Sequence, residues 1–121
     1  MTLKPLYWVG SSWKDLKGLP AEVQHGFGYA LFLAQAGDRH PDAKTLKGFG
    51  GGSVVEVVEH FDKGTYRAVY TSKFEGVVYV VHAFQKKSKH GRSTPQEDIR
   101  LVKERLKTAQ AHYEALKGTE S

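Results

Sequence analysis

Cysteine is missing from this 121-residue sequence, so disulfide bonds and thiolate chemistry are excluded. A zinc site would therefore need histidine and carboxylate ligands alone. Long apolar runs are missing too: the longest, Val77 to Phe84, is interrupted by His82 and is too short to span a bilayer. The first residues, Met1 to Pro5, carry no apolar stretch with a small-residue cleavage site. We expect a cytoplasmic protein that does not engage a membrane.

Several signatures of catalytic and cofactor sites are also missing. The sequence has no Gly-x-Ser-x-Gly elbow and no Cys–His pair, which disfavours hydrolysis through a covalent serine or cysteine intermediate. No pair among the six histidines has the helical i, i+4 spacing with an intervening glutamate. The glycines of segments 26–28 and 50–52 do not fit a phosphate loop, because no strand precedes the first segment and a strand follows the second. We expect close helix packing at 26–28, no metal and no small-molecule cofactor.

A single hydrophobic core is what a chain of 121 residues allows, and we expect one domain over residues 1–117 with a frayed tail at 118–121. The composition, 40% hydrophobic and 12% aromatic, is typical of a globular protein. The net charge of +5 favours a polyanionic partner such as nucleic acid, an acidic protein or an anionic membrane surface. Many basic proteins bind none of these, so the charge alone assigns no partner.

The first half of the chain predicts one short strand and two helices. Residues 3–9 are apolar and aromatic with an early proline, which is typical of an edge strand. Ser12 and Asp15 resemble a capping box that opens a single helical turn. A longer helix is predicted between residues 20 and 37, because apolar side chains recur at helical spacing at Val23, Phe27, Ala30, Leu31 and Ala34. A loop is predicted from 37 to 52.

The second half predicts three strands and a long helix. An alternating pattern rich in valine, tyrosine and phenylalanine defines strands at Val54–Phe61, Thr65–Ser72 and Val77–Gln85, with connections short enough for hairpins. A helix with one apolar stripe begins at Thr94-Pro95, where Thr94 would be the N-cap. The order β-α-α-β-β-β-α predicts an α+β fold with the helices on one face of a mostly antiparallel sheet. The opposite face would be open to a ligand.

Basic side chains are concentrated directly after the third of these strands. Between Gln85 and the last helix, the sequence has no acidic residue and carries His90 with the cations Lys86, Lys87, Lys89 and Arg92. A cationic loop anchored on a rigid strand is suited to phosphates, which supply most of the non-specific affinity for nucleic acids. The alternative is a solvated turn with no partner.

Three further polar residues lie on predicted strands. The guanidinium of Arg67 is suited to bidentate phosphate binding, but it could instead form a salt bridge to Glu56 or Glu59 on the neighbouring strand. His60 shares a strand face with Glu56, and His82 lies in an otherwise apolar strand where a buried, hydrogen-bonded histidine is an equally good reading. Histidine exchanges protons near neutral pH, so either one is suited to general acid–base work.

Two stretches of the sequence resemble the RelE/HigB toxin family in its phage-derived, HigB-like branch. They are residues 66–70, Tyr-Arg-Ala-Val-Tyr, and residues 81–89, Val-His-Ala-Phe-Gln-Lys-Lys-Ser-Lys, followed by Thr94-Pro95. The similarity extends from Leu6 to Tyr113. It implies a small RelE-like domain that acts as the toxin of a type II toxin–antitoxin system. It also implies a metal-independent endoribonuclease that cuts mRNA in the ribosomal A site and is silenced by a helix-turn-helix antitoxin.

The same resemblance implies roles for individual residues. Arg67 corresponds to a strand arginine of the family, and Lys86 and Lys87 correspond to basic residues after its last strand. In the implied reaction a ribose 2′-hydroxyl attacks the adjacent phosphate, a base takes its proton, and cations stabilise the developing charge. We expect Arg67 and Lys87 to be catalytic, and the RNA to be contacted by Lys86, Lys89, Arg92 and His82.

The sequence also departs from the family. RelE carries two lysines at alternate positions on the strand that corresponds to residues 54–60, and this chain has none there. Glu56 matches a glutamate common in the HigB-like branch, but the arginine usual two residues later is Val58. Either Glu56 or His60 is then the base, or the activity is weak or lost. Two alternatives follow: a ParE-like poison of DNA gyrase, and a decayed module that only binds an antitoxin or nucleic acid.

Overall fold

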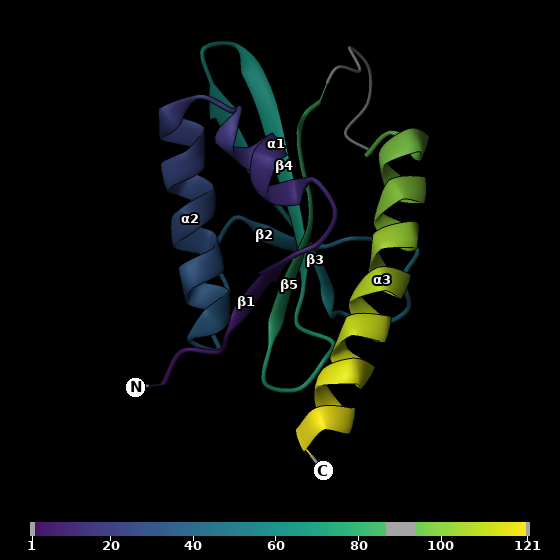
Figure 1. Cartoon of the computed structure of the whole chain (residues 1–121). Helices are drawn as coiled ribbons and strands as arrows, with labels where there is room; N and C mark the ends of the chain where they lie inside the picture. The colour runs from purple at the N-terminus through teal and green to yellow at the C-terminus, as the bar shows by residue number, and fades with distance from the viewer. Residues whose placement is uncertain (1, 87–93, 121) are drawn as a thin grey trace.

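The computed structural model describes residues 2–86 and 94–120, and these ranges form three helices and a five-stranded sheet (Figure 1). The strands are β1 (Leu6–Trp8), β2 (Ala43–Thr45), β3 (Val54–Phe61), β4 (Gly64–Thr71) and β5 (Val78–Gln85). The helices are α1 (Ser12–Lys17), α2 (Ala21–Gln35) and α3 (Gln96–Glu120). The sheet has the order β1-β5-β4-β3-β2, and only the β1–β5 pair is parallel. The predicted α+β class and mostly antiparallel sheet are confirmed.

The three consecutive strands β3, β4 and β5 lie within one residue of their predicted bounds. Asp62 and Lys63 connect β3 to β4 with left-handed φ angles of +48° and +67°. A two-residue turn of this hand matches the right-handed twist of the flanking strands. Strand β2 was not predicted, because three residues inside the loop 37–52 are too few to show an alternating pattern.

Helix α1 begins with a different serine from the one that the sequence indicated. Ser11 occupies the N-cap position, and its hydroxyl donates to the Asp15 carboxylate at 2.7 Å. The Ser12 hydroxyl is buried and donates to the Val80 carbonyl at 3.1 Å. The predicted capping box at Ser12 is therefore wrong, and Ser12 instead attaches α1 to β5.

Helices α1 and α2 cover one face of the sheet. The five apolar positions predicted for α2 are all buried, and they pack against alternate residues of β3, β4 and β5 that include Val57, Ala68 and Val80. A Cβ at Gly26 would collide with the Glu59 carboxylate of β3, whereas nothing lies within 4 Å of a Cβ at Gly28. Close packing therefore explains the first of these glycines and not the second.

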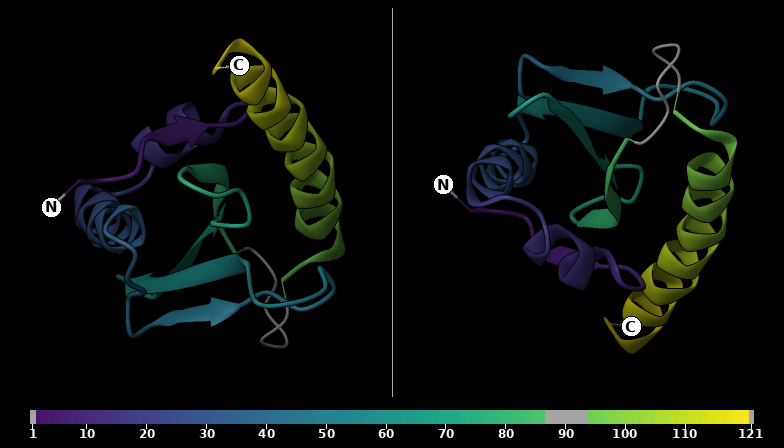
Figure 2. Two further views of the ribbon diagram at one scale, coloured as in Figure 1. Left: turned by 90° about the horizontal axis from the view of Figure 1, so that it is seen from below. Right: turned by 90° about the horizontal axis from the view of Figure 1, so that it is seen from above.

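Helix α3 covers the other face, which differs from the expected arrangement. Its buried Val102 and Ala109 pack with Val69 of β4 and with Tyr79 and Val81 of β5, the residues that alternate with those under α2. Seen along the sheet, α2 and α3 lie on opposite sides of it (Figure 2). The near-continuous apolar run of β5 is the reason, because a strand that is apolar on both faces must be covered on both.

Helix α3 extends slightly beyond its prediction at the C-terminal end. Its first helical hydrogen bond is donated by the Ile99 amide to the Pro95 carbonyl at 3.0 Å. The helical backbone includes residues 118–120, which were predicted to fray. In the described part of the chain, no helix combines the length and the apolar character needed to cross a bilayer.

Candidate functional site

The sheet face under the start of α3 carries most of the polar residues predicted to act. Residues opposite one another on neighbouring strands share a face. On the sheet face under α3, the register places three cross-strand rows of residues. They are Glu56–Val69–His82, Val58–Arg67–Phe84, and His60–Thr65 with Lys86. The third row is closed by a hydrogen bond from the Lys86 amide to the Thr65 carbonyl at 2.8 Å. The predicted residues of three strands are thus brought to one surface.

Arg67 and Glu56 form a buried ion pair at the centre of this face. Arg67 Nη1 lies 2.5 Å from Glu56 Oε1, and the residues are only 7% and 6% exposed. The Thr94 hydroxyl donates to Glu56 Oε2 at 2.5 Å, so both oxygens of the carboxylate accept hydrogen bonds. Of the alternatives left open for Arg67, the salt bridge is therefore present, and Glu56 is the partner. Glu59 faces the other way, beside Gly26 of α2.

Thr94 was predicted as the N-cap of the last helix, but α3 begins at Gln96 and the Pro95 carbonyl accepts its first helical hydrogen bond, so Pro95 holds the cap position. The contacts of Thr94 place it in the site instead. Its hydroxyl oxygen also lies 3.4 Å from Arg67 Nη1. Because Thr94 stands just before α3, this contact attaches the beginning of the helix to the ion pair on the sheet. The sequence signal for Thr94 was its Thr-Pro position, which says nothing about a partner 38 residues away.

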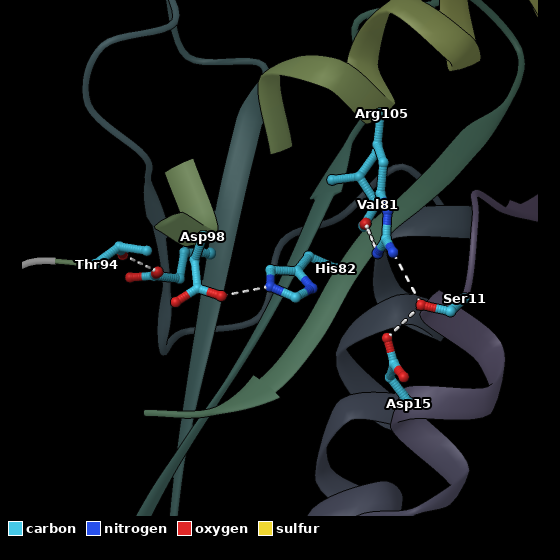
Figure 3. A network of polar contacts seen from close by, with 8 residues as sticks. Ser11, Asp15, Val81, His82, Thr94, Asp98 and Arg105 are labelled. Atoms are coloured by element: carbon cyan, nitrogen blue, oxygen red, sulfur yellow. Dashed lines mark hydrogen bonds and ion pairs between the residues drawn. The ribbon is translucent and has the colours of Figure 1, made fainter. Parts of the chain in front are cut away.

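His82 is buried under α3. Its Nε2 lies 2.7 Å from Asp98 Oδ1 (Figure 3). Its ring stacks on Phe84 with centroids 4.4 Å apart. Burial lowers the pKa of His82, and the Asp98 carboxylate offsets part of the effect. The imidazole is therefore neutral at pH 7, with the Nε2 proton donated to Asp98. The buried, hydrogen-bonded reading of His82 is the one that the geometry matches.

A bulge in β5 turns His82 toward α3. The β4–β5 register steps from Tyr70–Val80 to Val69–His82 and leaves Val81 as the extra residue. Arg105 of α3 donates to the Val81 carbonyl at 2.9 Å and to the Ser11 hydroxyl at 2.8 Å (Figure 3). These contacts join α3 to both β5 and the start of α1.

His60 and Lys86 form the more accessible edge of the face. His60 is exposed, and its Nδ1 lies 3.3 Å from the Thr65 hydroxyl. Lys86 is half-buried, and its pKa is lowered by burial and by the Arg67 guanidinium, with a partial offset from Glu56. The register places Lys86 and Arg67 in adjacent rows of the same face.

The remaining predicted cations, Lys87, Lys89 and Arg92, lie outside the described residues, as does His90. Over the ranges that are described, no group of three His, Asp or Glu side chains is placed to hold a metal ion. The described side chains that could act chemically are thus Arg67 with its counter-charge, Lys86 and the exposed His60. Three features of the site were not predicted from the sequence. They are the hydrogen bond from Thr94 to Glu56, the pairing of Asp98 with His82, and the place of Phe84 beside them.

Comparison with known families gives one result. Residues 14–107 match the family described as "Phage derived protein Gp49-like (DUF891)", a family associated with RelE/HigB-like toxins. The match runs from α1 into α3, covers more than three quarters of the 121 residues, and includes every residue of the three rows. No curated protein matches the chain.

Proposed function

Because this chain belongs to the phage-derived Gp49-like family, we propose that it is the toxin of a toxin–antitoxin pair, and that it binds and cleaves mRNA on the ribosome. The observation that carries the proposal is the polar sheet face. Arg67, Lys86 and His60 lie together there, at the point where the basic segment leaves β5. A cationic surface with a nearby proton acceptor is what phosphodiester cleavage by an internal nucleophile needs.

The reaction is an attack by the ribose 2′-oxygen on the adjacent phosphorus. The 2′-oxygen–phosphorus bond forms and the bond from phosphorus to the 5′-oxygen breaks, which yields a 2′,3′-cyclic phosphate and a 5′-hydroxyl end. No water and no redox partner takes part. Arg67, Lys86 and Lys87 stabilise the charge that builds on the phosphate oxygens. The proton of the 2′-hydroxyl is taken by a base on the protein, and the leaving 5′-oxygen receives a proton in return.

His60 is the better of the two candidate bases. Both carboxylate oxygens of Glu56 already accept short hydrogen bonds, one from Arg67 and one from Thr94, and the residue is buried. A base must instead present a lone pair to the substrate. His60 is exposed on the same face, four residues along β3 from Glu56. We assign Glu56 to the orientation of Arg67 and His60 to proton transfer.

The partners follow from the same proposal. A toxin of this kind requires a protein that silences it, and we propose a helix-turn-helix antitoxin with an acidic surface for the basic face. The net charge of +5 favours that partner and also the RNA of the ribosome. The site of action is then the cytoplasm, where ribosomes and mRNA meet.

A second candidate is a module that binds antitoxin or RNA without cutting. The observation that favours it is the Arg67–Glu56 pair, because a buried carboxylate neutralises the cation that a phosphate would need. The two candidates share every partner and differ only in the cleavage step. The test must therefore measure RNA ends as well as binding.

The experiment is induction of the wild-type chain and of His60→Ala, with His25→Ala as the matched control, an exposed histidine on α2. The proposal expects growth arrest and new 5′-hydroxyl mRNA ends for the wild type and for His25→Ala. For His60→Ala it expects cleavage slowed by roughly 10²- to 10⁴-fold with ribosome binding retained. Growth arrest without any mRNA cleavage, or cleavage by His60→Ala at the wild-type rate, contradicts the assignment. Antitoxin binding without arrest or cleavage supports the second candidate.

A further inference from the structure

Phe84 occupies an unusual position for an aromatic side chain in this fold. It lies in β5, half-buried, in the middle row of the polar face beside Arg67. One face of its ring lies against His82, at a centroid distance of 4.4 Å and an interplanar angle of 20°. Phe84 is only partly buried, because it packs against the edge of the hydrophobic cluster under α3.

The histidine behind the ring is itself fixed. His82 is 6% exposed, its Nε2 is bonded to Asp98 at 2.7 Å, and the bulge in β5 sets its direction. Phe84 therefore has a rigid backing, so little conformational freedom remains to be lost when something stacks on it. The backing consists of groups on β5 and on the first turn of α3, the two elements that flank the basic segment.

The stack leaves the second face of the Phe84 ring on the side away from His82. The next residue on this side of the sheet is Lys86, which directly follows β5 and lies about 6.6 Å further along at strand spacing. Thr65 lies opposite Lys86, and His60 lies opposite Thr65. A flat group stacked on Phe84 would thus lie over a row that ends in a cation at one side and a histidine at the other.

We propose that Phe84 is the stacking platform for a nucleobase of single-stranded RNA, held so that the attached ribose and phosphate lie over His60, Thr65 and Lys86. This inference rests on the proposed function and adds how the substrate is recognised. A base has an exposed π-face only when it is unpaired, so the platform selects single strands over duplexes. The neighbouring positive charge of Lys86 and Arg67 complements the backbone of RNA rather than an apolar ligand.

Stacking on the Phe84 ring would also position the ribose 2′-hydroxyl for its attack on the phosphorus. A base fixed on Phe84 fixes the sugar that is attached to it, and the 2′-hydroxyl of that sugar is the nucleophile of the proposed reaction. Such positioning lowers the barrier by removing rotational freedom before the chemical step. Because any base can stack, the contact by itself gives no strong sequence preference.

The test uses short RNA in which every 2′-oxygen is methylated, so that it binds but cannot be cut, with one base replaced by fluorescent 2-aminopurine. The variants are Phe84→Leu, which keeps an apolar side chain but removes the ring, and Phe84→Tyr, which keeps the ring. Phe32→Leu on α2 is the matched control, since Phe32 is an exposed aromatic on the other side of the sheet. Thermal unfolding of each variant verifies that it is folded. The same variants are assayed for cleavage of ordinary mRNA on ribosomes.

The proposal expects the wild type, Phe84→Tyr and Phe32→Leu to quench the 2-aminopurine signal on binding. It expects Phe84→Leu to lose that quenching and to bind roughly 5- to 150-fold more weakly, as the loss of one base–aromatic stack predicts. In the ribosome assay, the same variant should lose a comparable factor in kcat/KM. The stacking proposal is overturned if folded Phe84→Leu quenches the 2-aminopurine signal as the wild type does. If the chain recognises only ribosome-bound RNA, a wild-type kcat/KM for Phe84→Leu overturns it equally. Either result leaves the toxin assignment intact. A wild-type chain that neither binds nor cuts RNA in either assay refutes both.

Discussion

Neutralising Glu56 should destabilise the fold far more than neutralising Glu59 three residues away. The Glu56 carboxylate is 6% exposed and is the counter-charge of Arg67, which is 7% exposed. Removing one partner of a buried ion pair costs about 3–5 kcal/mol, because the other charge stays buried without compensation. Glu56→Gln retains an amide oxygen that can still accept a hydrogen bond, so we expect the lower end, about 3 kcal/mol.

That free energy translates into a large thermal shift. An unfolding entropy of about 2.1 cal/mol/K per residue, over the 121 residues of the chain, makes 3 kcal/mol equivalent to about 12 °C in Tm. Glu59→Gln is the matched control, since Glu59 is a half-exposed glutamate of the same strand, and we expect its change to stay within about 0.5 kcal/mol. Urea unfolding followed by circular dichroism measures both free energies directly.

A double variant separates the contribution of the Glu56–Arg67 pair to stability from its proposed contribution to RNA cleavage. Replacing both Glu56 and Arg67 with methionine removes the buried charges together, and such replacements are often neutral or stabilising by about 1–4 kcal/mol. We expect this protein to recover the stability lost in Glu56→Gln but not to cleave RNA, because the cation that we propose to bind the phosphate is gone. If Glu56→Gln and Glu59→Gln prove equally mild, the pair is better solvated than its burial indicates and the reasoning is wrong.

Two further predictions concern helix α2 and the histidine beneath α3. Gly28→Ala should stabilise the protein by about 1 kcal/mol, because nothing lies within 4 Å of the added Cβ. Gly26→Ala should gain less stability, because its Cβ meets the Glu59 carboxylate, and adding Glu59→Ala should restore the gain in stability. Identical unfolding midpoints for Gly26→Ala and Gly28→Ala would argue against that contact. Burial lowers the pKa of His82, so as the pH falls the histidine of the unfolded chain is protonated before that of the folded chain. The free energy of unfolding should therefore decrease as the pH falls through about 6.5. This one group contributes at most about 1.4 kcal/mol per pH unit. His82→Gln should flatten that slope in urea titrations, and an unchanged slope would mean that His82 titrates alike in the folded and unfolded states.

Local patterns in the sequence were sufficient for most of the elements. The helical spacing of Val23 to Ala34 predicted the buried stripe of α2 in full, and alternation predicted β3, β4 and β5 to within one residue. The order of these strands and their short connections then predicted the antiparallel pairing. The concentration of cations after β5 was equally visible, because it depends on nothing but adjacency along the chain.

The contacts that define the site came only with the tertiary structure. The sequence left Arg67 with two glutamates in reach, and the register, which places Glu56 and not Glu59 on the same face, decided between them. It offered no partner for His82, because Asp98 faces it only through a bulge in β5 and the packing of α3 on the second sheet face. Periodicity reports which side chains must leave water, whereas a pairing between distant segments depends on strand register and on which face each helix covers. These long-range choices are made by the balance of burial over the whole core, which no short stretch of the chain contains.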